Sequence, residues 1–268
     1  MAIAKTARIH PTAVIDPQAE VADDVQIGPL AVIEGPVVVG PGCQIKGGAY
    51  LIGPLKLGPA NVVHSRAVLG DAPQHLKYKG EPTGLEIGEG NIFRENVTIH
   101  RAAIPGSVTR IGNHNFFMAC SHIGHDCIVG NNCVLANGAV VGGHAELENN
   151  VTLSGNSAVH QFCRVGRLAM LSGVSATSMD MPPFLTYQRI NTVCGVNVVG
   201  MRRAGISPNA IEAIRHAFHI LYRSHNLLSV SLQQLERELG HISEIQELIA
   251  FIRASKRGVT LNADRYAA

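Results

Sequence analysis

Aliphatic side chains or phenylalanine occupy every sixth position of this chain from Ile9 to Leu171, and the series is interrupted only at His75, Glu81 and Pro105. A period of six residues matches neither the 3.6-residue turn of an α-helix nor the simple alternation of a half-buried strand. Self-similarity at one fixed period indicates a repeat architecture in which each repeat packs on its neighbours. The hydrophobic pattern therefore predicts a solenoid of short repeats.

The repeat also predicts how each group of six residues folds. Residues two apart in a strand share a face, so the repeated aliphatic residue and the small residue four positions later both point inward. Glycine often follows the aliphatic residue, as at Gly28 and Gly130, and asparagine stands near the same corner at Asn132 and Asn150. We expect these residues to accommodate left-handed backbone angles in tight corners. Three six-residue sides would complete one 18-residue coil of a parallel β-helix.

Two segments, Gly70 to Glu86 and Arg101 to Arg110, keep the six-residue phase but lose the inward residue. We predict that they are loops extruded from the prism, near residues 70–86 and 101–110. Long loops on a rigid scaffold often carry function. The β-helix is predicted to span residues 1–190, and a smaller helical domain is predicted over residues 191–268.

The C-terminal part changes to helical spacing. Ser207 and Pro208 provide an N-cap and a first-turn proline, and the apolar residues after them recur at helical intervals. Two capping boxes and one glycine predict the starts of two further helices and the end of the last: Ser231 with Gln234, Ser243 with Gln246, and Gly258. The predicted fold class is therefore mainly β, a parallel β-helix followed by a small C-terminal α-helical domain.

Composition narrows the function classes. The formal net charge of +2 does not by itself suggest a nucleic-acid binder. No apolar run approaches the roughly 18 residues that cross a bilayer, and the N-terminus lacks the apolar core of a signal peptide. We expect a soluble, cytoplasmic protein with no nucleic-acid partner and no integral membrane segment. Four cysteines occupy the small inward slot, where packing is expected rather than metal or disulfide chemistry: Cys43, Cys127, Cys133 and Cys163.

Residues 18 apart should stack on adjacent coils about 4.8 Å apart. This rule places Gly143 above His125 and Gln161 above Gly143, with His144 and His160 beside the same line. His122 lies on the side that leads to this corner. A column of imidazoles suits a general base, because imidazole titrates near neutral pH. An ordinary polar surface remains an open alternative. A metal centre is the less favoured one, since the spacing of His122 and His125 does not match the zinc-dependent carbonic anhydrases that share this type of β-helix.

Several motifs together closely resemble the UDP-N-acetylglucosamine O-acyltransferase family of lipid A biosynthesis, whose members are left-handed β-helices. The resemblance spans nearly the whole chain, and the left-handed sense of the predicted helix rests on it. The motifs that carry it are residues 74–83 (QHLKYKGEPT), 96–101 (NVTIHR), 121–127 (SHIGHDC), 143–144 (GH), 160–162 (HQF) and 195–197 (GVN), followed by Arg202 and Arg203.

The resemblance implies an activity and a set of roles. Members transfer an (R)-3-hydroxyacyl group from acyl carrier protein to the glucosamine 3-hydroxyl of UDP-N-acetylglucosamine, the first step of lipid A biosynthesis. It implies that His125 is the general base, that Asp126 orients it, and that the amide of Gly143 binds the oxyanion. The acyl donor is carried on the phosphopantetheine of the carrier protein, and no other cofactor and no metal are expected.

The resemblance also implies substrate contacts and partners. The residues expected to contact sugar, diphosphate or acyl carbonyl are Gln74, His75, Lys77, His122, His144, His160 and Gln161. Asn197 and Arg203 are expected to hold the nucleotide, and Gly173 is expected to leave room for a long acyl chain. A basic stretch suits the acidic carrier protein: Arg202, Arg203, Arg215, His216 and Arg223. Family members are homotrimers with active sites between neighbouring β-helices.

The chain departs from the family pattern at three positions. His75 replaces an acidic residue beside the sugar, and Val199 and Ala204 replace a polar and a basic residue near the nucleotide. A 3-amino sugar nucleotide therefore stays open as the acceptor. The related N-acyltransferase is disfavoured, because the repeats begin by Ile9 and leave no room for its N-terminal uridine-binding domain. A non-catalytic trimeric scaffold or binding module is the alternative from a different class.

Overall fold

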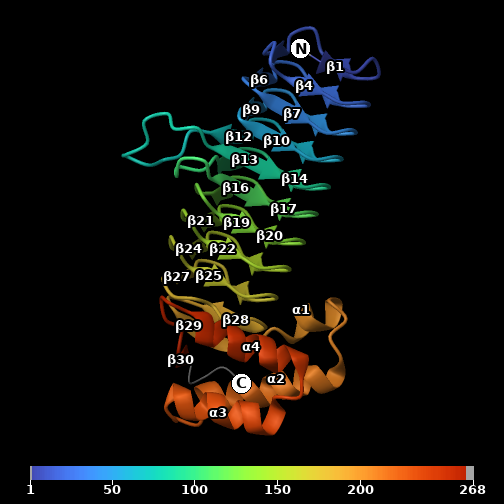
Figure 1. The fold of residues 1–268 in the computed structure, drawn as a ribbon. Coiled ribbons are helices and arrows are strands. Elements are labelled where there is room, and N and C mark those ends of the chain that lie inside the picture. The colour runs from blue at the N-terminus through green and yellow to red at the C-terminus, as the bar shows by residue number, and fades with distance from the viewer. Residues whose placement is uncertain (1, 264–268) are drawn as a thin grey trace.

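The structure, a computed structural model, describes residues 2–263 as a three-sided prism with helices at one end (Figure 1). Sheet A contains β1 (Ala2–Ile3), β4 (Glu20–Val21), β7 (Val37–Val39), β10 (Leu55–Leu57), β13 (Gly84–Ile87), β16 (Val108–Ile111), β19 (Ile128–Val129), β22 (Glu146–Leu147) and β25 (Arg164–Val165). Sheet C contains β3 (Val14–Ile15), β6 (Val32–Glu34), β9 (Tyr50–Ile52), β12 (Val68–Asp71), β15 (Thr98–His100), β18 (His122–Ile123), β21 (Val140–Val141), β24 (Ala158–Val159) and β27 (Ala176–Thr177).

Sheet B forms the third side and extends into the C-terminal part. Its strands are β2 (Arg8–Ile9), β5 (Gln26–Ile27), β8 (Gln44–Ile45), β11 (Val62–Val63), β14 (Ile92–Phe93), β17 (Phe116–Phe117), β20 (Val134–Leu135), β23 (Thr152–Leu153), β26 (Met170–Leu171), β28 (Leu185–Gln188), β29 (Thr192–Val196) and β30 (Asn262–Ala263). The last two pairings differ from the coil. Strand β29 runs antiparallel to β28, and β30, from the end of the chain, pairs in parallel with β29. The boundary predicted after residue 190 lies in the turn between these strands.

The 18-residue coil is confirmed by the strand register. Ile9 pairs with Ile27 and His122 pairs with Val140, in parallel ladders with an offset of 18. The repeated aliphatic residues and the residues two before them form one continuous buried column, which includes the four cysteines predicted to pack there. A core of aliphatic rungs explains why the chain needs few aromatic residues. The predicted fold class, a left-handed parallel β-helix followed by a small helical domain, is confirmed.

The corners confirm one part of the glycine prediction and correct another. The residue three after most of the aliphatic positions has a positive φ, as at Asn132 (57°) and Asn150 (61°). The glycines directly after the aliphatic residue, such as Gly28 and Gly130, do not have one, with the exception of Gly70 (89°). A Cβ on Gly28 would lie 2.7 Å from the backbone nitrogen of Gly47 on the next coil. These glycines are therefore required by close approach between coils, and the left-handed angles belong to the next corner residues.

The two predicted loops account for the two changes in register. Leu55 pairs with Leu85 at an offset of 30 residues, and Gly84 pairs with Val108 at an offset of 24. We call residues 72–83 the first loop and residues 101–107 the second loop. The first loop projects from the side of the prism between β12 and β13 (Figure 1). The prism therefore regains its phase after each loop, as the sequence period predicts.

The helices are α1 (Val198–Arg203), α2 (Pro208–Tyr222), α3 (Leu228–Leu239) and α4 (Ser243–Ala254). Ser207 caps α2 as predicted. The two predicted capping boxes are wrong: α3 and α4 begin after Leu227 and Ile242 with no side-chain cap. Ser231 lies inside α3 and donates to the Ile220 carbonyl, so a tertiary hydrogen bond replaces the predicted cap. Among the helices of residues 2–263, none combines the length and apolar character that a membrane crossing requires.

The end of α4 also differs from the prediction. The helix ends at Ala254, and Gly258 lies in the segment that follows, where its carbonyl accepts from the Asp180 N–H at 3.0 Å. Its φ of 86° serves this extended contact with the last coil. The prediction that Gly258 ends the last helix is therefore wrong, because the helix stops four residues earlier and Gly258 contacts the last coil instead.

Candidate active site

The predicted imidazole column lies at the corner where sheet C turns into sheet A. Here a groove of about 410 Å³ is lined by the three stacked predicted residues, by four further polar residues, and by corner glycines and valines. The polar or reactive members are Gln74, His100, His122, His125, Gly143, His160 and Gln161. The stacking inferred from the 18-residue period therefore brings His125, Gly143 and Gln161 together in one groove.

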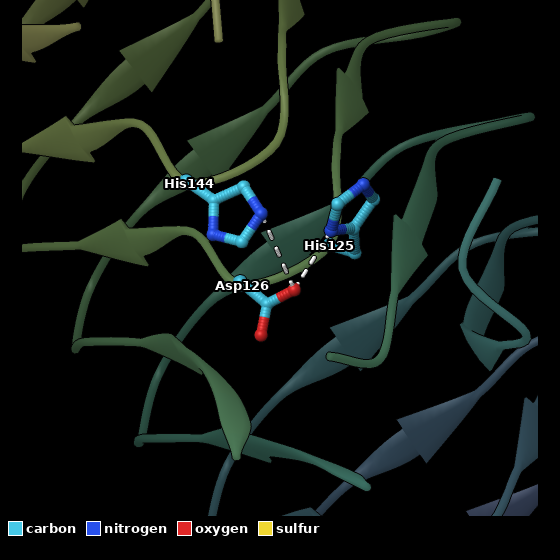
Figure 2. A group of neighbouring side chains, drawn as sticks. All are labelled: His125, Asp126 and His144. Atoms are coloured by element: carbon cyan, nitrogen blue, oxygen red, sulfur yellow. Dashed lines mark hydrogen bonds and ion pairs between the residues drawn. The ribbon is translucent and has the colours of Figure 1, made fainter. Parts of the chain in front are cut away.

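His125 and Asp126 form a tight pair. Nδ1 of His125 lies 2.7 Å from Oδ2 of Asp126, and both side chains are largely buried (Figure 2). Neighbours in a strand would point in opposite directions. Asp126 has a φ of 60°, and its backbone N–H donates to the Thr109 hydroxyl at 2.8 Å. The positive φ of the corner therefore turns two consecutive side chains toward each other.

The second loop surrounds the carboxylate of Asp126 with donors. The Ser107 hydroxyl donates to Oδ1 at 2.6 Å, and the backbone N–H of Ala103 donates to Oδ2 at 2.9 Å. Burial alone would raise the pKa of Asp126, but these bonds and the one from His125 outweigh it and lower the pKa. Asp126 is therefore ionised near neutral pH and can accept the Nδ1–H of His125.

A second imidazole layer packs around this pair. The rings of His75 and His144 meet the ring of His125 edge to face, with centroids 5.2 and 5.0 Å away. Nε2 of His144 lies 3.9 Å from Oδ2 of Asp126, and its other face stacks on Phe162. Burial lowers the pKa of His144, and the neighbouring imidazoles add to this effect against the pull of Asp126. His75, His125 and His144 therefore form one packed cluster built from the first loop and two coils.

His122 and His100 form a separate neutral pair in the same groove. Nδ1 of His122 lies 2.8 Å from the Thr98 hydroxyl, and its ring packs edge to face on His100. Burial, together with His100 and His125, lowers the pKa of His122 to about 4. The Gln74 N–H donates to Nδ1 of His100, so the proton of His100 resides on Nε2. Both rings are therefore uncharged near neutral pH and suit hydrogen bonding to substrate.

Gly143 leaves space above the ring of His125 that no other residue would leave. A Cβ at this position would lie 2.8 Å from Cε1 and 2.9 Å from Nε2 of His125. The Gly143 carbonyl accepts from the Phe162 N–H, whereas the Gly143 N–H has no acceptor among residues 2–263. The glycine therefore offers an open approach and a free amide donor beside Nε2.

The same cluster meets the distance condition for a metal site. His125, Asp126 and His144 each place a potential ligand atom within 4.8 Å of the others (Figure 2). The Asp126 carboxylate, however, already accepts from Ser107, Ala103 and His125. A cation would have to displace these donors. The donor set therefore suits a hydrogen-bonded acid–base pair better than a metal centre.

Other predicted site residues lie outside this groove. Lys77 is exposed in the first loop. A Cβ on Gly173 would have only the Gly155 carbonyl oxygen near it, at 3.4 Å, so the surface there is open. Asn197 caps α1, accepting from the Gly200 N–H and donating to the Leu168 carbonyl, and Arg203 ends that helix. Within one described chain, these residues are not brought to His125.

Four residues contact the site residues without having been predicted to do so. They are Ser107 and Ala103 at the carboxylate of Asp126, His100 beside Gln74 of the first loop, and Phe162 stacked on His144. The interruption at Pro105 marked the second loop, but a periodic pattern cannot say which loop atoms turn inward. Phe162 occupies the positive-φ corner position one coil above His144, so the 18-residue rule could have found it.

Comparisons with known proteins agree along the whole chain. Residues 180–260 match a family model described as UDP N-acetylglucosamine O-acyltransferase, domain 2, and residues 18–53 and 109–143 match the bacterial transferase hexapeptide model. Acyl-[acyl-carrier-protein]–UDP-N-acetylglucosamine O-acyltransferases of Myxococcus xanthus and Anaeromyxobacter sp. are 49% and 47% identical, over 95% and 94% of this chain and 99% of each relative.

Solved structures give the same result. The UDP-N-acetylglucosamine O-acyltransferase of Moraxella catarrhalis superimposes with a TM-score of 0.90 at 39% identity, covering 94% of this chain and 99% of that one. The Arabidopsis UDP-N-acetylglucosamine acyltransferase superimposes with a TM-score of 0.83 at 30% identity, covering 96% and 99%. With this fold, this groove and these relatives, the chain belongs to the UDP-N-acetylglucosamine O-acyltransferase family.

Proposed function

We propose that this protein transfers an (R)-3-hydroxyacyl group from acyl carrier protein to the 3-hydroxyl of the glucosamine in UDP-N-acetylglucosamine, the first step of lipid A biosynthesis. The names of its relatives support the donor and acceptor classes. The observation that carries the proposal is the buried His125–Asp126 pair facing the free Gly143 amide. This arrangement suits acyl transfer to a hydroxyl.

The proposed proton path follows from the hydrogen bonds. Asp126 accepts the Nδ1–H of His125, so Nε2 carries the free lone pair. Nε2 takes the proton of the sugar hydroxyl as its oxygen attacks the thioester carbonyl. The oxyanion of the tetrahedral intermediate accepts from the Gly143 N–H. When the carbon–sulfur bond breaks, His125 returns its proton to the departing phosphopantetheine thiolate, which restores the starting state.

Imidazole and amide side chains suit the remaining contacts. His122, His160 and Gln161 line the groove beside His125. They are proposed to donate to sugar, diphosphate or acyl carbonyl oxygens, together with His144, Gln74 and Lys77. His75 packs on His125, at a position where the family usually has a carboxylate. An imidazole there removes a negative charge that would hold an amine protonated. A 3-amino sugar nucleotide is therefore the second candidate acceptor.

The position of the expected nucleotide residues outside the groove of their own chain suits a site shared between subunits, as in the homotrimer that the resemblance implies. Asn197 and Arg203 lie at α1, away from the groove of the same chain. We propose that they reach the nucleotide bound at a neighbouring subunit's groove, with the guanidinium holding phosphate. The open surface at Gly173 is proposed to admit a long acyl chain.

The donor partner is proposed to bind at the helical end. A pocket of about 620 Å³ is lined by Arg215, His216, His219 and Arg223 on α2 and beyond it. Its basic side chains suit the acidic surface of an acyl carrier protein. No cofactor is proposed beyond the phosphopantetheine on that partner, and the proposed location is the cytoplasm, where these substrates are made.

Mass-spectrometric detection of acylated UDP-sugar tests the proposal. The protein is incubated with a panel of 3-hydroxyacyl carrier proteins and with UDP-N-acetylglucosamine or its 3-amino analogue. We expect product with the natural sugar, and His125→Ala to lower the rate about 10³-fold as a missing general base does. His10→Ala is the matched control, because His10 lies outside the groove.

The outcomes separate the candidate functions. Product with the 3-amino analogue alone would favour the amino acceptor. Equal rates for wild type and His125→Ala would refute the assignment of the base. No product with any donor, from a protein that remains a folded trimer by light scattering, would favour the non-catalytic scaffold.

A further inference from the structure

The segment that follows α4 is fastened to the last coil of the prism beside the groove. The Ser255 hydroxyl donates to Oδ2 of Asp180 at 2.7 Å, and the Thr260 N–H donates to the Asp180 carbonyl at 3.1 Å. Asp180 is only 1% exposed, and its other carboxylate oxygen accepts from the Arg164 N–H. A buried carboxylate with these partners gives the segment one fixed position.

Arg257 uses this fixed position to reach a predicted substrate residue. Its Nε donates to the Ser178 carbonyl at 2.7 Å, and its Nη2 lies 3.0 Å from Nδ1 of His160. These contacts join residues 79 and 97 positions apart in the sequence. Because two nitrogens of one planar guanidinium are held at once, the Nη2 group is aimed at the imidazole.

The contact determines which ring nitrogen of His160 carries hydrogen. A guanidinium has five N–H donors, no acceptor, and is always charged. Nδ1 of His160 must therefore accept, which leaves hydrogen on Nε2. The Gln161 carbonyl also lies 3.2 Å from Nδ1 and would favour a hydrogen there. That alternative would point an N–H at the cationic Arg257, so the closer and charged donor decides the tautomer.

We propose that Arg257 is a positioning residue that holds His160 in its Nε2–H tautomer, so that the ring donates a hydrogen bond to an oxygen of the bound sugar nucleotide. His160 lines the groove with His125 and Gly143. The inference rests on the proposed function in one respect, that His160 touches substrate. It adds that the segment after α4, which does not line the groove, determines that His160 is the donor in that contact.

Kinetics of a double-mutant cycle test the coupling. We expect Arg257→Ala and His160→Ala each to raise KM for the sugar nucleotide about tenfold with a much smaller change in kcat, the pattern of lost uniform binding. The double variant should be no worse than His160→Ala, because Arg257 acts through that ring. Arg257→Lys should recover part of the loss. Lys256→Ala is the matched control, because Lys256 is an exposed, charged neighbour of Arg257 and the change leaves both the Ser255 anchor and His160 in place.

The tautomer is read independently of activity. In ¹⁵N-histidine-labelled protein, two-bond proton–nitrogen correlations of the His160 ring should show hydrogen on Nε2 in wild type and in Lys256→Ala, and a changed pattern in Arg257→Ala. Hydrogen on Nδ1 in wild type, additive losses in the cycle, or equal effects of Lys256→Ala and Arg257→Ala would each overturn the proposal. If His160→Ala left the kinetics unchanged while the wild-type His160 ring showed the expected signal, the substrate contact would be refuted. The effect of Arg257 on the tautomer would still stand.

Discussion

The uninterrupted coils from Ile111 to Leu171 and the two extruded loops contribute to the same groove in different ways. The coils place His125 and Gly143 by register, because each lies at a fixed step of an 18-residue ladder. The loops place Ser107 and His75 by tertiary contact, with no period to guide them. In this molecule, regular structure determines where His125 and Gly143 lie, and the loops supply the partners that surround the His125–Asp126 pair.

The largest effect is expected from changing a residue that the regular coils place. Gly143→Ala would place a methyl group 2.8 Å from the His125 ring, and no shift of a flexible side-chain end can relieve it without moving the base. We expect kcat/KM to fall about 10³-fold, as when a general base is displaced from its working position, with the fold unchanged by circular dichroism. Gly84→Ala is the control, because its Cβ would meet nothing closer than 3.6 Å. Comparable losses in both variants would show that the close approach is not the cause.

This division also explains what could be predicted from the sequence. The prism, the coil length and the stacking at His125 follow from one arithmetic rule, because each coil repeats the same backbone. The starts of α3 and α4 do not, since Ser231 satisfies a tertiary partner, the Ile220 carbonyl, in place of its own helix end. Arg257 had no signal at all, because its contact with His160 spans 97 residues and depends on how the end of the chain packs.

A smaller effect is expected at the carboxylate of Asp126, which contacts both the coils and the second loop. Oδ2 of Asp126 accepts from both His125 and the Ala103 N–H. In Asp126→Asn the Ala103 N–H should keep the amide oxygen at that position, so His125 retains its tautomer and loses only the charge beside it. We expect kcat/KM to fall about 10- to 100-fold, less than the loss when an aspartate-to-asparagine change also inverts the tautomer. Steady-state kinetics that showed Asp126→Asn as inactive as His125→Ala would contradict this orientation by the loop.

Removing one loop donor should cost less still. Ser107→Ala deletes the 2.6 Å hydrogen bond to Oδ1 and leaves the Ala103 bond to Oδ2. We expect kcat/KM to fall about three- to tenfold, in line with one hydrogen bond to a charged group. The loss of activity at the most acidic end of the pH–rate profile, where Asp126 itself takes up a proton, should also move to higher pH, because the lost bond helps lower the pKa of Asp126. Ser65→Ala changes an exposed corner serine of a regular coil and should do neither.

The smallest expected effect concerns stability at low pH and comes from the neutral pair built by the coils. The pKa of His122 is lowered to about 4 in the folded protein, while an unfolded histidine has its ordinary value of 6.5. Between these values the unfolded chain binds a proton that the folded chain refuses, so stability falls as pH falls from 6.5 toward 4. Each such histidine contributes a slope of at most about 1.4 kcal/mol per pH unit. His122→Gln removes this term, so its melting temperature should drop less than that of wild type between pH 6.5 and pH 4.5, whereas parallel melting curves would mean that His122 takes up its proton without unfolding.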